Sequence, residues 1–593
     1  MLCGLEIHQR LCGRKLFNAC PTPAADMPLD AKSMRIRRKL FSAKSELGKT
    51  DEASKFEKSK DIEFEYAAPA NYSCLVDTDE EPPSNISRDA LLSALKFAKY
   101  CNCSIVDEVQ VMRKMVLDGS NPSGFQRTSL IALGGSLKYA DGEIPLETIC
   151  IEEESAGIVE KNSGLAVYRL DRLGIPLIEI ATAPVFKTAK DAAKGAKALG
   201  TYLRMLENVM RGLGTIRQDV NISTPEGTRV EIKGLQDIKM LELLVENEVK
   251  RQEGIAAIKK DLISRGFLQT GHSPVDLQKI FSKTKCKIIS KALESGGAVL
   301  GAKLPLYAGL LGREFYAGRR FGSELSDYAK IAGGVRGLIH SDEDMKKYDI
   351  SVFELEQIKE ILDIGKNDAF ILIADKKEKA QKAILAAIAR SQILGVAPET
   401  RKADEKGGSS FMRPMAGAHR MYPETDLRPI RITKELLEES GELETPDARR
   451  EKLAELLGKD MGERMLLSYN YARFMRMANS GADAKMLANI LEQTLVALRR
   501  EGVKVEKITD EYILQILALL HENKITKAAI SELLRLGAGA SDAHKIAKEH
   551  KLLRISGKKL IELYKKEGKD LKKFMGKYRL VVDGKEIMEL IHD

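Results

Sequence analysis

Three side chains that could bind a metal ion or act in catalysis lie in strand-like runs of the sequence. Polar and apolar residues alternate from Gly4 to His8, so Glu6 and His8 are expected on one face of a strand. The same alternation over residues 148–154 places Glu152 opposite two isoleucines. A strand histidine is more often structural, and Glu152 is equally consistent with an exposed acidic rim, so both alternatives stay open.

Glu179 is the strongest of the three candidates. It stands in a nearly continuous apolar run from Ile175 to Thr182, a pattern typical of a strand buried on both faces. An ionised carboxylate out of water costs several kcal/mol unless it is paired or bound to a metal ion. The sequence therefore predicts that Glu179 binds a metal ion or takes part in catalysis.

A hairpin-like pair of runs, 215–223 and 228–233, carries further charged side chains on either side of a turn-like segment. Alternation aligns Arg217, Asp219 and Asn221 on the first run, and Glu231 and Lys233 on the second. Such a face is either an ordinary hydrated sheet surface or the surroundings of a charged substrate.

A basic pair and a polar loop suit an anion. Arg113 and Lys114 supply the bases, and the turn-rich segment 118–127, which contains Ser120 and Asn121, could cradle an anion with backbone N–H groups. The sequence holds no GxxxxGK[ST] loop and no glycine fingerprint after a strand. A nucleotide would therefore not be held in either of those ways.

The elements that must position these residues belong to a multidomain chain. At 593 residues and 65.7 kDa the chain exceeds one hydrophobic core. Residues 1–270 alternate strand-like and helical runs and predict an α+β domain, whereas Gly-rich turns from 271 to 405 predict a separate α/β module. The polar stretch 401–410 is interpreted as a linker that leads back to the first domain, and residues 406–430 are counted with that domain. Residues 431–502 predict a helical domain, and 503–593 a helical tail.

The net charge of +9 belongs to the tail. Between Lys545 and Arg579 there are thirteen bases and four acids, a surplus equal to that of the whole chain. Apolar residues are interleaved with the bases, which indicates packed helices. Their basic face is either an ordinary solvated surface or a contact for a phosphate backbone, and the concentrated surplus of bases favours the second. The lysines expected to bind nucleic acid are Lys558, Lys559, Lys565, Lys566, Lys572 and Lys573.

Composition excludes several other classes of protein. Hydrophobic residues make up 44% and charged residues 31%, as in folded globular chains. No uncharged run is long enough to span a bilayer, the first residues lack the pattern of a signal peptide, and the eight cysteines follow no disulfide-module spacing. We expect reduced thiols, no zinc site, no membrane association and a cytoplasmic location.

Eight short motifs occur in order through the first domain: Gly4–His8, Met112–Lys114, Asp118–Asn121, Ser123–Arg127, Ile151–Glu154, Asp171–Ile180, Ile216–Ser223 and Val230–Lys233. Together they resemble the B/E family of tRNA-dependent amidotransferases. The module at 271–405 looks like the insertion domain of bacterial-type aspartyl-tRNA synthetases. This module and the motif Met421–Asp426 favour the archaeal-type E branch, which acts on glutamyl-tRNA(Gln). The implied architecture is a cradle domain of 1–270 plus 406–430, an inserted α/β module, a helical domain and a basic helical tail.

The resemblance implies an enzyme that uses ATP and Mg²⁺ to phosphorylate glutamate misacylated onto tRNA(Gln), and then amidates it. By position the metal ligands and catalytic residues would be His8, Glu152 and Glu179. The surroundings of the nucleotide or acyl phosphate would comprise Arg113, Lys114, Ser120, Asn121, Arg217, Asp219, Asn221, Glu231 and Lys233. Ammonia would come from an asparaginase-like D subunit, in a heterotetramer of two D and two E subunits. The alternatives are a non-catalytic tRNA-binding factor and a B-type subunit that also acts on Asp-tRNA(Asn).

Overall fold

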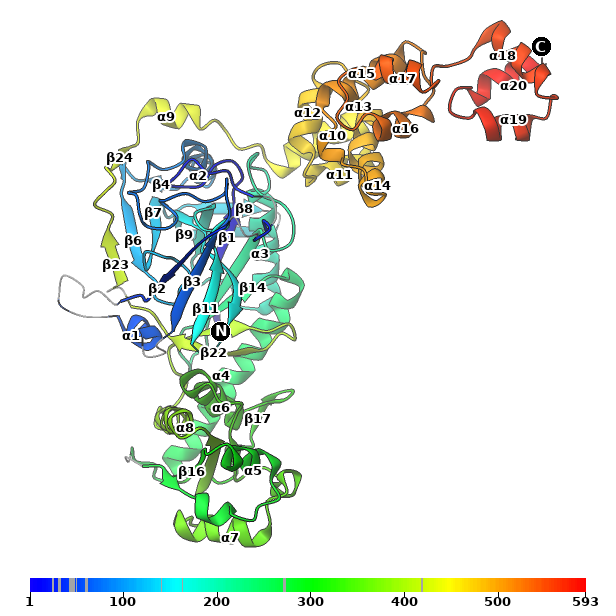
Figure 1. Ribbon diagram of the computed structural model, residues 1–593. Helices are drawn as coiled ribbons and strands as arrows, with labels where there is room; N and C mark the ends of the chain where they lie inside the picture. Colours follow the sequence, from blue (N-terminus) through cyan, green and yellow to red (C-terminus); the bar gives the residue numbers. More distant parts are fainter. Residues whose placement is uncertain are drawn as a thin grey trace. The chain divides into compact units, whose positions relative to one another are not determined.

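The computed structural model describes residues 1–23, 26–29, 33–41, 48, 51–58, 62–139, 141–162, 164–269, 273–417 and 420–592. The chain forms two compact units, Met1–Leu443 and Glu444–Asp593. Figure 1 shows the helices and strands of both units. Within the described ranges, every helix is too short or too polar to span a membrane.

A sheet of twelve strands, counted over the described residues, organises the first unit. Its main path runs β22-β21-β14-β13-β1-β12-β9-β7-β6-β23, and β4 and β8 pair with β7 and β9. The strands, in chain order, are β1 (Leu2–Arg10), β4 (Ser104–Ile105), β6 (Val111–Met115), β7 (Phe125–Leu133), β8 (Ser136–Tyr139), β9 (Gly142–Glu153), β12 (Pro176–Thr182), β13 (Ile216–Ser223), β14 (Val230–Leu235), β21 (Glu399–Ala403), β22 (Ser409–Pro414) and β23 (Met421–Pro423). The strands predicted around His8, Glu152 and Glu179 are thereby confirmed as β1, β9 and β12.

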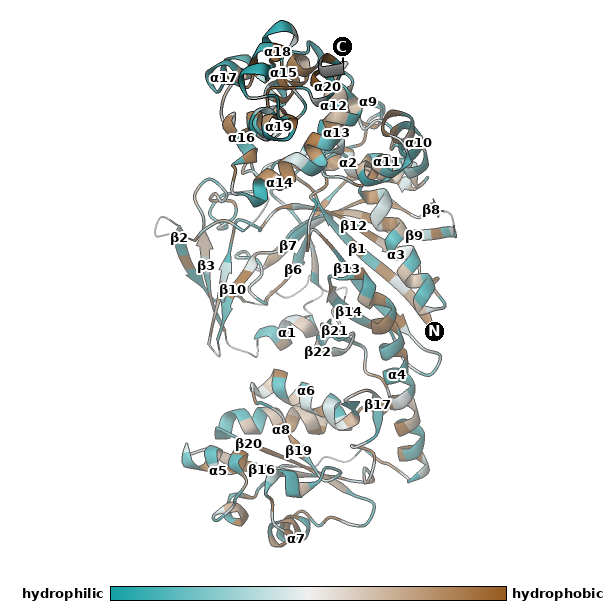
Figure 2. Cartoon of the chain, turned by 90° about the vertical axis from the view of Figure 1, so that its right-hand side faces the viewer, coloured by the Kyte–Doolittle hydropathy of each residue, from teal (hydrophilic) through white to brown (hydrophobic). Residues whose placement is uncertain are grey.

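Strand β1 lies between β12 and β13 and is antiparallel to both. Its odd-numbered residues Leu5 and Ile7 are buried, and α3 (Ala189–Leu203) packs on β1 while α4 (Leu241–Ser264) packs on β13 (Figure 2). The helices therefore cover the apolar side of these strands. Alternation leaves the even-numbered residues of β1 on the other side, where the polar side chains gather.

Smaller elements complete this unit. A four-stranded sheet is formed by β10 (Gly157–Lys161), β11 (Leu165–Arg169), β3 (Glu63–Ala68) and β2 (Met34–Arg38). Its core includes Phe64, Tyr66 and Tyr168. The other short elements are α1 (Glu52–Lys58), α2 (Arg88–Tyr100), β5 (Glu108–Val109), β24 (Ile430–Arg431) and α9 (Lys434–Glu439).

A separate α/β layer follows α4. Its strands pair in the order β15-β16-β20-β19. The strands are β15 (Val275–Asp276), β16 (Ala298–Leu304), β19 (Ile339–His340) and β20 (Ala369–Asp375). They are surrounded by a hairpin of β17 (Glu314–Tyr316) and β18 (Arg319–Arg320) and by the helices α5 (Lys287–Glu294), α6 (Phe321–Gly333), α7 (Val352–Ile361) and α8 (Lys377–Ser391). Apolar clusters that include Phe321 and Phe281 form two cores. We call residues 275–391 the inserted module.

The chain returns to the large sheet earlier than predicted. Strands β21 and β22, with the turn between them, occupy the stretch 401–410 that we interpreted as a linker, so that interpretation is wrong and the boundary moves from 405 to about 398. The polar composition was misleading because Arg401, although charged, is fully buried in ion pairs.

The second unit is helical, as predicted. Its helices are α10 (Pro446–Leu457), α11 (Lys459–Leu466), α12 (Tyr471–Ala478), α13 (Ala484–Asn489), α14 (Leu495–Arg500), α15 (Asp510–His521), α16 (Ala529–Leu536), α17 (Ala543–Glu549), α18 (Gly557–Lys566), α19 (Leu571–Tyr578) and α20 (Gly584–His592). The predicted start signals are confirmed, because Thr445 and Thr509 cap α10 and α15 through their side chains.

The predicted division of this unit at residue 502 is wrong. One apolar core extends from Leu453 to Leu552 across that position, whereas Leu560, Phe574 and Ile587 belong to a second, small core formed by α18–α20. Helical periodicity marks each helix, but it does not reveal which helices pack together. The separate tail is therefore the segment 557–592.

Candidate active site

Six acidic or imidazole side chains lie on one side of five neighbouring strands of the large sheet. We call this set the carboxylate face: Glu6 and His8 on β1, Glu152 on β9, Glu179 on β12, Asp219 on β13 and Glu231 on β14. Register brings them together, because His8 stands opposite Glu179 and Glu6 opposite Asp219. The three residues that the sequence singled out first therefore lie side by side.

His8 is at the centre of the face. Its Nε2 lies 3.3 Å from Glu179 Oε2, 3.5 Å from Glu6 Oε1 and 4.0 Å from Glu152 Oε1. Burial opposes protonation of this imidazole, but the hydrogen bond to Glu179 and the nearby negative charges raise the pKa of His8 to about 9. In the protein alone the imidazole is thus a cation at neutral pH.

The carboxylates around His8 differ in their affinity for protons. Burial and the charge of Glu179 raise the pKa of Glu6 to about 7. Burial also opposes ionisation of Glu179, but the hydrogen bond and charge of His8 lower the pKa of Glu179 to about 2. One side chain of the face is therefore held as an anion, and its neighbour titrates close to neutral pH.

Two lysines extend over the face from its two sides. Lys114 on β6 donates to Glu152 Oε2, and burial of its ammonium is outweighed by Glu152 and Glu179, which raise the pKa of Lys114. Lys233 on β14 lies 2.5 Å from Asp219 Oδ2 and 2.8 Å from Glu231 Oε1. These ammonium groups lie where they can meet phosphate oxygens once the carboxylates bind a cation.

A cavity of about 270 Å³ adjoins the carboxylate face. Glu6, Asn221 and Glu231 line it, together with Arg229 and Arg420. Glu6 was expected on the same strand face as His8 but was not predicted as a ligand, and neither arginine was predicted at the site. Alternation was the available signal for Glu6, whereas Arg420 is brought here by the return of the chain at β23.

Other predicted residues lie elsewhere. Arg217 lies on the same side of β13 as Asp219, but its guanidinium pairs with Glu154 at 2.7 Å, at the end of the carboxylate face. Arg10 also pairs with Glu154 at 2.7 Å. Asn121 donates to Glu153, whose side chain points to the opposite side of β9 from Glu152.

The loop between β6 and β7 is organised by its own side chains. The backbone N–H of Ser120 donates to Asp118, and Arg113 lies over the ring of Phe125, 5.2 Å from its centroid. The structure therefore does not bring Arg113, Ser120 and Asn121 onto the carboxylate face.

The donor atoms of the carboxylate face suit a hard divalent cation. One ligand atom each from Glu6, His8 and Glu179 lies within 4.8 Å of the others, and the same holds for Glu6, Asp219 and Glu231. Oxygen ligands with one imidazole match the preferences of Mg²⁺, which keeps open positions for water and phosphate. The residues present therefore fit the Mg²⁺ that the family resemblance implies.

The predicted nucleic-acid lysines lie on α18 and α19 of the second unit. All six are exposed: Lys558, Lys559, Lys565, Lys566, Lys572 and Lys573. Lys573 lies 3.9 Å from Asp570, on the surface of α19. The side chains are thus accessible to a polyanion.

Comparison with known proteins places this geometry in a family. Residues 1–438 match the model of the GatB/GatE catalytic domain, which covers most of the chain and all of the carboxylate face. The chain belongs to the GatB/GatE family. Residues 472–581 match a second model of this family, described as a GatB domain.

Similar proteins share one description, the E subunit of glutamyl-tRNA(Gln) amidotransferase. The one from Aeropyrum pernix is 43% identical, over 90% of this chain and 84% of its own length. The one from Methanocaldococcus jannaschii is 41% identical, over 90% and 85%. The one from Sulfurisphaera tokodaii is 38% identical, over 99% and 97%. The predicted family is thereby confirmed.

Proposed function

We propose that the chain is the ATP-dependent subunit of a glutamyl-tRNA(Gln) amidotransferase, which converts Glu-tRNA(Gln) to Gln-tRNA(Gln). A family that covers residues 1–438 supports this proposal, as do relatives with that name along most of the chain. The observation that carries it is the carboxylate face, where His8 and Glu179 lie 3.3 Å apart beside two lysines.

The first step joins two anions. The γ-phosphoryl group of ATP passes to the side-chain carboxylate of the tRNA-bound glutamate, which forms an acyl phosphate and ADP. Because both reactants are negative, the site must neutralise charge as they approach. Mg²⁺ held by His8, Glu179, Glu6 and Glu152 would supply part of that charge, and Lys114 and Lys233 would orient phosphate oxygens from either side.

In the second step ammonia attacks the acyl carbon. The bond to the bridging oxygen breaks, inorganic phosphate leaves with that oxygen, and a proton is lost from the attacking nitrogen. The product is the glutaminyl ester of the same tRNA.

The remaining parts have roles in assembly and tRNA binding. An asparaginase-like D subunit would release the ammonia, in a complex of two D and two E subunits. Lysines on α18 and α19 would hold the phosphate backbone of tRNA(Gln), because exposed ammonium groups attract phosphates.

One reaction tests the proposal. The chain and its D partner are incubated with Glu-tRNA(Gln), ATP, Mg²⁺ and an amide donor, and the esterified amino acid is identified. We expect Gln-tRNA(Gln) that depends on ATP. If tRNA binds but no glutamine forms, the chain is a binding factor, and efficient amidation of Asp-tRNA(Asn) would instead assign it to the B type.

A further inference from the structure

Strand β21, which follows the inserted module in the chain, pairs with the edge of the carboxylate face at β14. Its parallel pairing with β14 sets Thr400 opposite Glu231, and Thr400 Oγ1 donates to Glu231 Oε2 at 2.9 Å. The other oxygen of Glu231 is 2.8 Å from Lys233. Both carboxylate oxygens are thus held, one by Lys233 of β14 and one by Thr400 of β21.

The neighbours of Thr400 on β21 point the other way, toward the inserted module. Arg401 and Glu399 are almost completely buried, and Arg401 Nη1 lies 3.0 Å from Oε2 of Glu324 on α6. Tyr328, also on α6, donates to Glu399. Alternation along β21 therefore couples the module on one side to Glu231 on the other.

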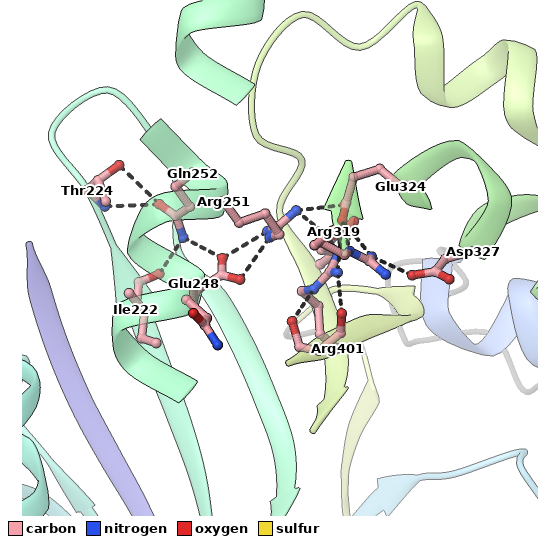
Figure 3. Close-up of polar contacts among 12 residues, drawn as sticks. Ile222, Thr224, Glu248, Arg251, Gln252, Arg319, Glu324, Asp327 and Arg401 are labelled. Atoms are coloured by element: carbon pink, nitrogen blue, oxygen red, sulfur yellow. Dashed lines mark hydrogen bonds and ion pairs between the residues drawn. The ribbon is translucent and has the colours of Figure 1, made fainter. Parts of the chain in front are cut away.

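Glu324 is the centre of a buried charge network (Figure 3). Arg251 of α4 lies 2.8 Å from Glu324 and also pairs with Glu248 at 2.8 Å, while Arg319 approaches Glu324 from β18. Arg251, Glu248 and Glu324 are buried, so removal of one of them leaves the charges of its partners uncompensated. The network consequently fixes how α4, α6 and β21 meet.

The network also returns to the sheet through α4. Gln252 on α4 accepts from the backbone N–H of Thr224 at 3.0 Å and donates to the carbonyl of Ile222 at 3.2 Å, at the end of β13. Strand β13 carries Asp219, which shares Lys233 with Glu231. A continuous polar chain therefore leaves the sheet at β13, passes through α4 and α6, and re-enters at β21.

We propose that Thr400 is a positioning residue for Glu231, and that the buried network of the inserted module holds β21 in the register that makes this contact. The inserted module is thus part of the apparatus that shapes the site. The inference rests on the proposed function, because it assigns Glu231 to the surroundings of the reacting phosphate.

The test compares Thr400→Val with Thr400→Ser in the complete complex with its D partner. Valine keeps the shape and loses the hydroxyl, whereas serine keeps the hydroxyl. We expect Thr400→Val to lower kcat about tenfold or more, with the KM for tRNA and the melting temperature close to wild type, and Thr400→Ser to restore kcat. Thr201→Val, which removes a helix hydroxyl bonded to a backbone carbonyl, is the matched control.

A second arm tests the network. Glu324→Gln should lower kcat and accelerate amide hydrogen exchange in β21, and the double variant with Thr400→Val should lose no more activity than the less active single variant. Any of three results would overturn the inference: a wild-type kcat in Thr400→Val, a loss of kcat in Thr400→Ser as large as that in Thr400→Val, or losses of kcat that add in the double variant. If wild type makes no Gln-tRNA(Gln), the proposed function has failed instead. If Glu324→Gln does not fold, the comparison at Thr400 still decides.

Discussion

Glu179→Gln removes one negative charge from the carboxylate face and keeps the shape of the side chain. Glu179 Oε2 lies 3.3 Å from His8 Nε2, and opposite unit charges at that distance attract by roughly 5 kcal/mol at an effective dielectric constant of about 20. Glu6 lies 3.5 Å and Glu152 4.0 Å from the same nitrogen, so part of the attraction survives. If about half is lost, roughly 2.5 kcal/mol, and a cation bound at the face loses the same amount of stabilisation as the acyl phosphate forms, amidation kcat falls about 70-fold.

Two assays check this prediction independently. Steady-state amidation should show the loss in kcat while the KM for tRNA stays within about twofold. Nuclear magnetic resonance of labelled histidine in metal-free protein should show wild-type His8 protonated well above pH 7, since its pKa is about 9, and the pKa of His8 displaced toward its ordinary value in the variant. Glu160→Gln, at an exposed position of β10, is the control. Nearly full kcat together with an unchanged His8 titration would refute the reasoning.

Three further predictions follow from the same structure. Lys114→Met should raise the KM for ATP or lower kcat by about 10-fold or more, because the variant lacks the ammonium group that contacts Glu152. Unchanged kinetics would exclude Lys114 from the site. Deletion of 557–593, which has its own core, should raise the KM for tRNA and flatten its dependence on salt; an unchanged salt slope would contradict this. Burial alone would raise the pKa of Glu324, but Arg401 and Arg319 hold this pKa well below 4.5 in the folded chain. The ionised carboxylate of Glu324 therefore stabilises the folded chain above pH 4.5, and this stabilisation is lost as the pH falls through and below that value. The stability gap between wild type and Glu324→Gln, about 3–5 kcal/mol at neutral pH, should narrow on acidification in urea unfolding, and a constant gap would argue against it.

The strands of the candidate site could be predicted from local patterns. Alternation identified β1 around His8, β9 around Glu152 and β13 with β14, and a continuous apolar run identified β12 around Glu179. These signals are local because side-chain direction along a strand repeats every two residues. What they could not supply is register, which alone sets His8 opposite Glu179.

The failures were at positions where the decisive partner is distant in sequence. Arg401 was assigned to a linker because its neighbours are polar, but Glu324, which buries it, is 77 residues away. Asn121, predicted in one set with residues of the carboxylate face, lies off that face because Glu153 engages it on the opposite side of β9. The domain boundary at 502 failed for a related reason, since the packing of amphipathic helices is decided by tertiary contacts.

Transfer of a carboxylate oxygen to phosphate tests the central claim most directly. Glutamate labelled with oxygen-18 in its side-chain carboxylate is esterified to tRNA(Gln) and amidated by the complex with unlabelled ATP. Because ammonia displaces phosphate together with the bridging oxygen, we predict one labelled oxygen in each inorganic phosphate released with Gln-tRNA(Gln). Gln-tRNA(Gln) formed together with unlabelled phosphate would contradict phosphorylation of the glutamyl side chain.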